Sequence, residues 1–170
     1  DVHSFPTRRS SDLAGSDRSR QESVALGLAA LGRCEADAVV LVHDAARPLT
    51  PPQVTERVID AVAGGAGAVI PVLPVTDTLK TVDASGVVIG TPRRSDMVAV
   101  QTPQGFRWDV LIRAHEEGAS LGADEARAAT DDAGLVEAIG GTVHTVAGDE
   151  RSMKVTRPLD LALAQILVAE

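Results

Sequence analysis

Two short apolar runs, each followed soon by polar residues, constrain the fold of this 170-residue chain more than any other feature. Residues 38–42 read Ala-Val-Val-Leu-Val, and residues 68–73 read Ala-Val-Ile-Pro-Val-Leu. Neither run alternates between apolar and polar residues. An unbroken apolar run is typical of a strand buried on both faces, as in a parallel sheet covered by helices. We therefore predict that both segments are interior strands of such a sheet.

Segments with helical periodicity alternate with these runs. Residues that would share one face of a helix recur at intervals of three or four. These positions are Val24, Leu28 and Leu31; Val54, Val58 and Val62; Trp108, Leu111, Ile112 and His115; and Leu159, Ala162, Leu163, Ile166 and Leu167. Thr50 and Thr130 are predicted to be N-caps, and Pro158 to open the last helix. The pattern indicates a three-layer α/β fold with a mostly parallel sheet, in which ligands bind at the carboxyl ends of strands.

Two stretches depart from this pattern. Residues 74–97 contain two extended segments around an Asp-Ala-Ser-Gly turn at 83–86, so we expect a β-arm that projects from the sheet. Residues 1–13 are polar and irregular, and the string Phe-Pro-Thr-Arg-Arg-Ser-Ser-Asp-Leu is similar to translated sequencing-adapter DNA. We expect residues 1–13 to be a non-native or disordered leader, and residues 14–170 to form one domain.

Composition argues against several classes of function. The net charge of −8 argues against a general nucleic-acid-binding protein, which needs a basic face to neutralise phosphates. The single cysteine, Cys34, excludes an internal disulfide and a cysteine-based zinc cluster. No apolar run approaches the roughly 18 residues of a membrane span, and no secretory signal is visible, so we expect a cytoplasmic protein.

Charged residues follow the first apolar run directly, in the string His-Asp-Ala-Ala-Arg at 43–47. Asp44 is a candidate ligand of Mg²⁺, which prefers carboxylate and phosphate oxygens. Arg47 is a candidate phosphate-binding residue because of its planar fork. The alternative is a turn in which Asp44 caps the backbone and pairs with Arg47, and the residue types alone leave both interpretations open. His43 is interpreted as orienting this loop rather than acting as a base.

The other candidate residues also have a structural alternative. Thr78 lies in the arm, where an exposed strand with solvated charges is the simpler interpretation. The pair Arg93 and Arg94 suits an anion or a partner chain, or is solvated. Lys154 is predicted to lie in a strand just before a helix, where it could approach a phosphate. Arg157 and Asp160 could equally form a local pair at that helix end.

Taken together, several strings resemble the 2-C-methyl-D-erythritol 4-phosphate cytidylyltransferases. The strings are RQESVALGL, VLVHDAARP, VTDTLK, VQTPQGF, ATDDA and MKVTRPLD, and the resemblance covers residues 15–170. It implies a Rossmann-like nucleotidyltransferase fold and a homodimer with interlocking β-arms. It also implies Mg²⁺-dependent transfer of CMP from CTP to 2-C-methyl-D-erythritol 4-phosphate in non-mevalonate isoprenoid synthesis, with release of pyrophosphate.

The resemblance also implies roles for individual residues. The catalytic residues would be Lys154, Arg94 and Asp44, with Asp44 as the metal ligand. The sugar phosphate would be bound by Thr78, Arg94, Arg47, Thr102 and Thr130, the arm residues Thr78 and Arg94 reaching across the dimer interface. The nucleotide would be bound by Ser23, Asp44, Ala45 and Lys154, with Ser23 in a loop that contacts the cytosine or ribose. Arg94 and Lys154 from two copies would then converge near Asp44.

One departure from the family pattern affects the expected activity. The glycine-rich loop that cradles the triphosphate in this family is absent from the sequence, so we expect the polypeptide alone to turn over CTP poorly or not at all. Three alternatives remain: a ribitol-5-phosphate cytidylyltransferase, a non-catalytic nucleotide-binding or assembly module, and one half of a fused bifunctional enzyme. The first differs from the family above only in its acceptor.

Overall fold

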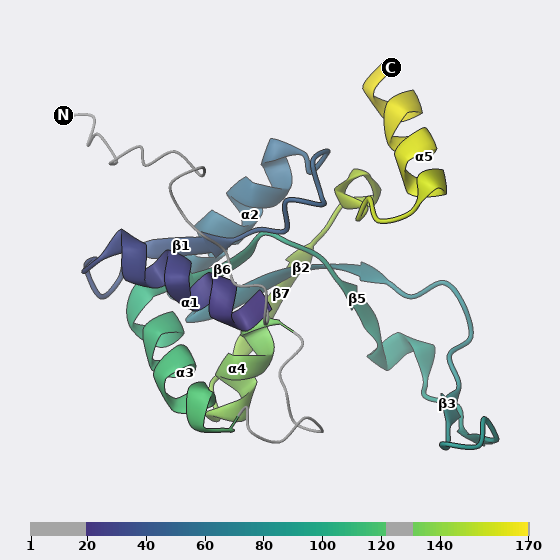
Figure 1. Ribbon diagram of the computed structural model, residues 1–170, viewed down its shortest axis with the longest axis horizontal. Coiled ribbons are helices and arrows are strands. Elements are labelled where there is room, and N and C mark those ends of the chain that lie inside the picture. The colour runs from purple at the N-terminus through teal and green to yellow at the C-terminus, as the bar shows by residue number, and fades with distance from the viewer. Residues whose placement is uncertain (1–19, 122–130, 170) are drawn as a thin grey trace.

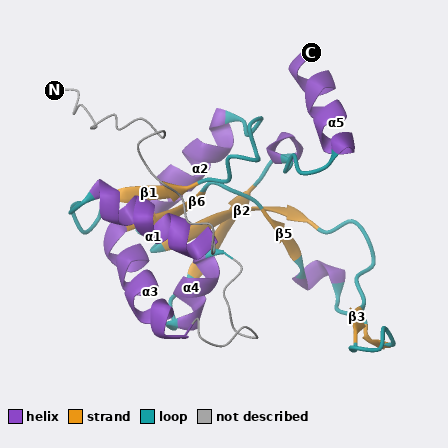
Figure 2. Cartoon of the chain, in the orientation of Figure 1, coloured by secondary structure: helices purple, strands orange, loops and turns teal. Residues whose placement is uncertain are grey.

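The computed structural model describes residues 20–121 and 131–169 of the chain (Figure 1). A twisted sheet carries helices on both faces, and Figure 2 shows the strands grouped between them. The helices are α1 (Arg20–Leu31), α2 (Pro52–Ala63), α3 (Trp108–Leu121), α4 (Asp132–Ala138) and α5 (Pro158–Ala169), with short 3-10 turns at Arg94–Asp96 and Glu150–Ser152. The strands are β1 (Val39–Val42), β2 (Ala68–Pro74), β3 (Thr81–Val82), β4 (Val88–Gly90), β5 (Val98–Val100), β6 (Gln104–Arg107) and β7 (Val143–Ala147). The expected α/β class is confirmed.

The main sheet is mixed. β1 and β2 both pair antiparallel with β6, so these two strands run in the same direction, and β7 pairs parallel with β2. β5 and β6 lie along the same edge of β2 and run the opposite way. Three strands, β1, β2 and β7, therefore run in the same direction. β1 and β2 are not hydrogen-bonded to each other, because the antiparallel strand β6 lies between them. The carboxyl ends of β1, β2 and β7 meet at one edge.

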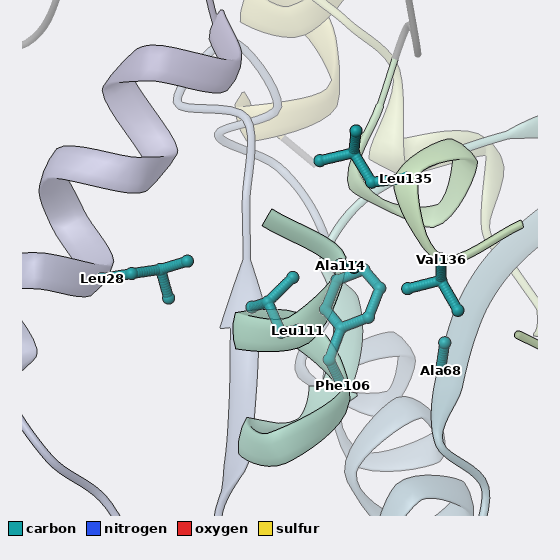
Figure 3. Packing of buried hydrophobic residues seen from close by; sticks show 7 residues of the cluster. All are labelled: Leu28, Ala68, Phe106, Leu111, Ala114, Leu135 and Val136. Atoms are coloured by element: carbon teal, nitrogen blue, oxygen red, sulfur yellow. The ribbon is translucent and has the colours of Figure 1, made fainter. Parts of the chain in front are cut away.

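Alternate residues of the apolar runs face the two helical layers. Ala68 on β2 packs with Leu28 of α1, Leu111 of α3 and Val136 of α4, and Figure 3 shows these side chains gathered around Phe106. The next residue, Val69, packs on the other face against Val58 and Val62 of α2. Burial on both faces explains why the run contains no polar position.

The strand β6 was not predicted from the sequence. It follows Pro103, begins with a polar glutamine and is only four residues long, so it carries neither an apolar run nor an alternating pattern. It is nevertheless buried, because Gly105 lets the strand pass directly beneath α2. A Cβ at this position would meet Val58 and would lie 3.2 Å from a methyl group of Val62.

Both predicted helix caps need correction. The N-cap of α2 is Pro51, with Pro52 in the first turn, and no side chain caps this helix. Pro52 lacks one of the N–H groups that a Thr50 cap could bind, and the Thr50 hydroxyl instead donates to the Arg47 carbonyl at 3.1 Å. The N-cap of α4 is Asp131, whose carboxylate accepts from the Gly134 amide at 2.9 Å. Thr130 lies outside the described residues, as does the predicted leader.

Residues 75–97 leave the main sheet and form a projecting arm (Figure 1). Its β3–β4 hairpin confirms the predicted turn, in which the Asp83 carboxylate accepts from the Ser85 and Val87 amides and Gly86 has a φ of +86°. Apolar side chains at the hairpin are exposed, Ile89 to 67%. The arm therefore presents apolar surface that the described chain does not cover.

The helix α5 also stands apart from the core (Figure 1). It begins at Pro158 as predicted, but most of its apolar stripe is not packed: Leu159, Ala162, Leu163 and Ile166 are exposed, and within the helix only Ala164 is buried. Apolar periodicity identifies a helix but not the surface it packs against. None of the helices in the described ranges is long and apolar enough to cross a membrane.

Candidate functional site

A pocket of about 170 Å³ opens at the sheet edge where β1 and β7 end, which is the edge expected to bind ligands in such folds. Five segments distant in sequence contribute to it: the start of α1, the turn after β1, the segment from the end of β5 to the start of β6, the N-cap of α4, and the loop after β7. The lining residues are Arg20, Asp44, Arg47, Val100, Gln101, Thr102, Gln104, Asp131 and Lys154.

Asp44 lies at the centre of this pocket and is surrounded by cations. The Lys154 Nζ is 3.1 Å from Asp44 Oδ2, and the Arg47 Nε is 3.5 Å from the same oxygen. The Arg20 Nε is 3.6 Å from Asp44 Oδ1. Three positive side chains thus converge on one carboxylate, and such a cluster can also attract phosphate groups.

The pKa of Asp44 reflects this surrounding. Burial by itself would raise the pKa of the carboxyl group. The hydrogen bond and charge of Lys154, together with the charges of Arg20 and Arg47, outweigh burial and bring the pKa below its usual value. Asp44 is therefore a carboxylate at neutral pH, the form that a divalent cation requires.

Thr102 fixes the backbone on which Asp44 is carried. Its hydroxyl accepts the Asp44 amide hydrogen at 3.0 Å and lies 2.9 Å from His43 Nδ1. The segment before β6 and the turn after β1 are joined at this point. His43 thus orients the loop, as interpreted from the sequence, and Thr102 acts on Asp44 through the main chain.

The guanidinium group of Arg47 donates hydrogen bonds to backbone carbonyl groups. One terminal nitrogen donates to the Ser152 carbonyl at 2.6 Å and the other to the Val100 carbonyl at 3.4 Å. The ion pair with Asp44 that the sequence left as an alternative is present. Arg47 therefore joins the turn after β1 to the loop after β7 and supports Asp44 from one side.

Arg20 is a site residue that sequence reasoning missed. Its Nη1 donates to Asp132 Oδ2 at 2.6 Å, and the other oxygen of Asp132 is 3.0 Å from His115 Nε2. Asp132 is only 1% exposed. Burial would raise its pKa, but the hydrogen bond from His115 and the charge of Arg20 bring the pKa below its usual value. This buried carboxylate holds Arg20 beside Asp44.

Gln104 and Asp131 close the same side of the pocket. The Gln104 side-chain amide donates to Asp131 Oδ2 at 2.6 Å, and its oxygen accepts from the Ala133 amide at 3.2 Å. Gln104 is fully buried, so the two bonds satisfy its polar atoms away from water. The first turn of α4 is thereby tied to the start of β6.

The structure brings together Asp44, Arg47, Thr102 and Lys154, four of the residues predicted for the site. Ala45 follows Asp44 in the turn. Two placements need correction. Lys154 lies in a loop, not in a strand, because the chain leaves β7 at Ala147 and forms a 3-10 turn first. Ser23 lies in the first turn of α1, not in a loop, because that helix begins at Arg20.

The arm residues predicted for the site do not reach this pocket within one chain. Thr78 and Arg94 are absent from its lining, and Arg94 Nη1 donates instead to the Thr76 carbonyl of the arm at 2.8 Å. Their predicted role across a dimer interface stays a prediction. Thr130, which lies outside the described residues, stays one as well.

A larger groove of about 440 Å³ lies between α1 and α3. Leu28, Trp108 and Ile112 are among the residues that form its mainly apolar lining. The chemistry expected at strand ends needs convergent charged groups, so the distribution of charge identifies the smaller pocket as the candidate site.

Comparisons with known proteins agree with this geometry. A family model described as 2-C-methyl-D-erythritol 4-phosphate cytidylyltransferase matches residues 3–170. A protein of that name from Rhodococcus jostii (strain RHA1) is 52% identical over 151 residues, which are 89% of this chain and 62% of the relative. One from Frankia casuarinae is 57% identical over 131 residues, which are 77% of this chain and 47% of the relative. The chain spans less than two thirds of the length of both relatives.

Solved structures give the same result. The crystal structure of 2-C-methyl-D-erythritol 4-phosphate cytidylyltransferase from Thermus thermophilus superposes on the chain with a TM-score of 0.78 and 39% identity. The superposition covers 93% of this chain and 72% of that one. The similarity therefore extends over nearly all of the chain in both sequence and fold.

Proposed function

The chain belongs to the 2-C-methyl-D-erythritol 4-phosphate cytidylyltransferase family, and from this premise we propose that the whole protein transfers CMP from CTP to 2-C-methyl-D-erythritol 4-phosphate and releases pyrophosphate. The observation that carries the proposal is the convergence of Lys154, Arg47 and Arg20 on Asp44 at the carboxyl edge of the sheet. The expected cytoplasmic location stays a prediction.

The reaction needs positioning and positive charge more than it needs a protein nucleophile. An oxygen of the acceptor phosphate forms a bond to the α-phosphorus of CTP. The bond from that phosphorus to the oxygen bridging to the β-phosphate breaks, and pyrophosphate leaves with the electron pair. Both reactants are anions that repel each other, so preorganised cations lower the barrier. In this proposal Lys154 and Arg20 supply positive charge from within the chain.

Mg²⁺ fits the donors that the pocket offers. Within the described residues no group of three His, Cys, Asp or Glu side chains is placed to hold a metal ion, and Asp44 is the proposed protein ligand. Mg²⁺ often binds through one or two carboxylates and completes its shell with water and substrate phosphates, so a single ionised carboxylate suffices. When bound, the ion would neutralise charge on the phosphate oxygens. Lys154 and Arg47 would then share Asp44 with it.

The remaining positive charge is proposed to come from a second copy of the chain. Arg94 and Thr78 lie on the arm, whose exposed apolar residues include Val87, Val88 and Ile89. An exposed apolar arm is suited to packing against another copy. We propose a homodimer in which the arm of one protomer carries Arg94 of the partner subunit to the pocket that contains Asp44 and Lys154.

The test is a single-turnover assay with the whole protein in excess over CTP labelled at the α-phosphate. The expected result is transfer of the label to 2-C-methyl-D-erythritol 4-phosphate in the presence of Mg²⁺. Ribitol 5-phosphate serves as the competing acceptor, because the two substrates differ in their carbon skeleton and both carry a terminal phosphate. Single-turnover conditions detect transfer even if steady-state turnover is slow.

Each other outcome would contradict the proposal in a distinct way. Preferential transfer of the label to ribitol 5-phosphate would support the alternative function, that of a ribitol-5-phosphate cytidylyltransferase. Binding of CTP, measured by calorimetry, without transfer to either acceptor would support a non-catalytic nucleotide-binding module. If the protein neither binds CTP nor transfers the label, the proposal that CTP is its substrate is wrong.

A further inference from the structure

Lys154 needs an external constraint to hold its ammonium group near Asp44. Its side chain is 48% exposed, and it follows a 3-10 turn in a segment without regular structure. A long side chain on such a loop samples many positions unless the backbone beneath it is fixed. The question is therefore which groups fix the loop formed by residues 148–157.

Gln101 binds the first part of this loop with both ends of its side-chain amide. Its Nε2 donates to the Asp149 carbonyl at 2.9 Å, and its Oε1 accepts from the Asp149 amide at 3.0 Å. Gln101 is 4% exposed, so water does not compete easily for these bonds. These two bonds resemble those that the backbone of a neighbouring strand would make with Asp149.

Gly148 leaves the space that this contact needs. A Cβ at residue 148 would collide with Gln101 Oε1 and would lie 3.0 Å from the Val72 carbonyl. The Gly148 amide donates to that same carbonyl at 2.9 Å, which continues the register of β7 beside β2. The backbone at the start of the loop is therefore bonded to the Val72 carbonyl on one side and to the Gln101 side chain on the other.

Two further bonds carry the constraint from Asp149 to Lys154. The Ser152 carbonyl accepts from Arg47 at 2.6 Å, and the Val155 amide donates to the Ala46 carbonyl at 2.7 Å. Lys154 lies between these points, opposite the turn that carries Asp44. At the start of the loop, Gln101 binds Asp149, and Arg57 donates to the Ala147 and Gly148 carbonyls at 2.9 Å and 3.3 Å. The turn after β1 fixes the middle of the loop.

We propose that Gln101 is a positioning residue that sets the location of Lys154 by fastening Asp149 at the start of the loop 148–157. This inference rests on the proposed function, in which Lys154 stabilises the charge that develops on the phosphates. Gln101 lines the pocket, but both polar ends of its side chain are bonded to Asp149. It acts on the reaction through the lysine.

The first test needs no ligand. Gln101→Met keeps the volume of the side chain and removes both hydrogen bonds, and Gly148→Ala keeps the glutamine but places a methyl group against its Oε1, which disrupts its contact with Asp149. In both variants, hydrogen–deuterium exchange of the amides at residues 149–155 should become about tenfold faster, with little change elsewhere. Val62→Ala is the control, because it weakens the core beneath α2 without touching the loop. Unchanged exchange at 149–155 would overturn the proposal.

The second test is a double-mutant cycle on single-turnover transfer from CTP. Gln101→Met should slow transfer on the order of tenfold to a hundredfold in the otherwise unaltered chain. In the Lys154→Ala background the same substitution should have little further effect, because the residue through which Gln101 acts is gone. Equal effects in both backgrounds would show a general structural role and would overturn the proposal.

The two tests separate the failure of this inference from the failure of the proposed function. If the unaltered whole protein transfers no label to any acceptor, the proposed function fails, and hydrogen exchange alone decides whether Gln101 fastens the loop. If transfer occurs and the cycle is additive, the function stands and the positioning role fails.

Discussion

The pocket beside Asp44 and the arm formed by residues 75–97 both carry predicted site residues, but they use their charges differently. In the pocket, Asp44 contacts Arg20, Arg47 and Lys154. Arg20 also donates to the buried Asp132 carboxylate, and Arg47 donates to the Ser152 carbonyl. On the arm, Arg94 donates to a carbonyl of its own segment, and apolar neighbours face solvent. The difference indicates that one chain assembles the carboxylate part of the pocket, whereas the arm presents Arg94 and its apolar side chains away from that pocket.

The largest effect on the rate of CMP transfer is expected from a substitution in the pocket. Lys154→Ala removes a cation placed 3.1 Å from Asp44, and transfer of CMP should fall on the order of 10²- to 10³-fold, as when a preorganised charge-stabilising group is lost. Single-turnover assays measure this effect. The control is Arg93→Ala on the arm, an exposed residue paired with Asp96, which should change the rate less than twofold. A Lys154→Ala variant that retains half the rate would contradict the account.

The second effect concerns stability. Asp132→Asn removes the charge between Arg20 and His115 at a buried position, and the free energy of unfolding should fall by about 3 kcal/mol. For a chain of this size the midpoint of thermal unfolding should fall by roughly 6–12 °C. The matched arm variant is Asp96→Asn, whose exposed pair with Arg93 should contribute less than about 1 kcal/mol. Equal losses of unfolding free energy in Asp132→Asn and Asp96→Asn would show that the ion pairs of the pocket and of the arm do not differ in their contribution to stability.

The same pair gives a smaller effect that depends on pH. The pKa of Asp132 is lower in the folded chain than the value of about 3.9 expected in the unfolded chain. The stability from its ionised form is therefore fully present above about pH 4 and is lost as pH falls through the folded pKa. In urea titrations, the difference between the unaltered chain and Asp132→Asn should shrink below pH 4. A difference that grows on acidification would contradict this sign.

The smallest effect on folding is expected at the arm. Ile89→Lys places a charge on a side chain that is already 67% exposed, so the free energy of unfolding of one chain should change by less than about 0.5 kcal/mol. If the arms of two copies pack together, the same substitution should shift the mass measured by light scattering from dimer to monomer. A dimer that persists in Ile89→Lys would show that the arm tip is not in the interface.

Features that depend on local sequence were predicted well. The runs at 38–42 and 68–73 identified β1 and β2 as strands. The expected burial is confirmed for the first part of β2 but is wrong for β1, which lies at the edge of the described sheet and is only partly buried. The turn at 83–86 identified the hairpin, because Asp83 and Gly86 have the side chain and the backbone freedom that such a turn requires. Asp44 and Arg47 were located because they follow a predicted strand end.

Features that depend on contacts between distant segments were not predicted. Arg20 became a site residue only because Asp132, 112 positions later, holds its guanidinium group. β6 has no periodicity of its own and is recognisable only by its place between β1 and β2. The loop that carries Lys154 is fixed by Gln101 and Arg47, and neither bond leaves a pattern in the sequence. The exposure of α5 likewise depends on neighbours that periodicity does not identify.

Complementation between two variants tests the central claim, that the pocket and the arm of two copies form one site. Arg94→Ala and Lys154→Ala chains are coexpressed, and CMP transfer is compared with that of each variant alone. In a mixed dimer one of the two sites has both residues intact, so random pairing should restore about a quarter of the unaltered activity. Activity no higher than the average of the two variants would show that Arg94 and Lys154 do not meet across two copies.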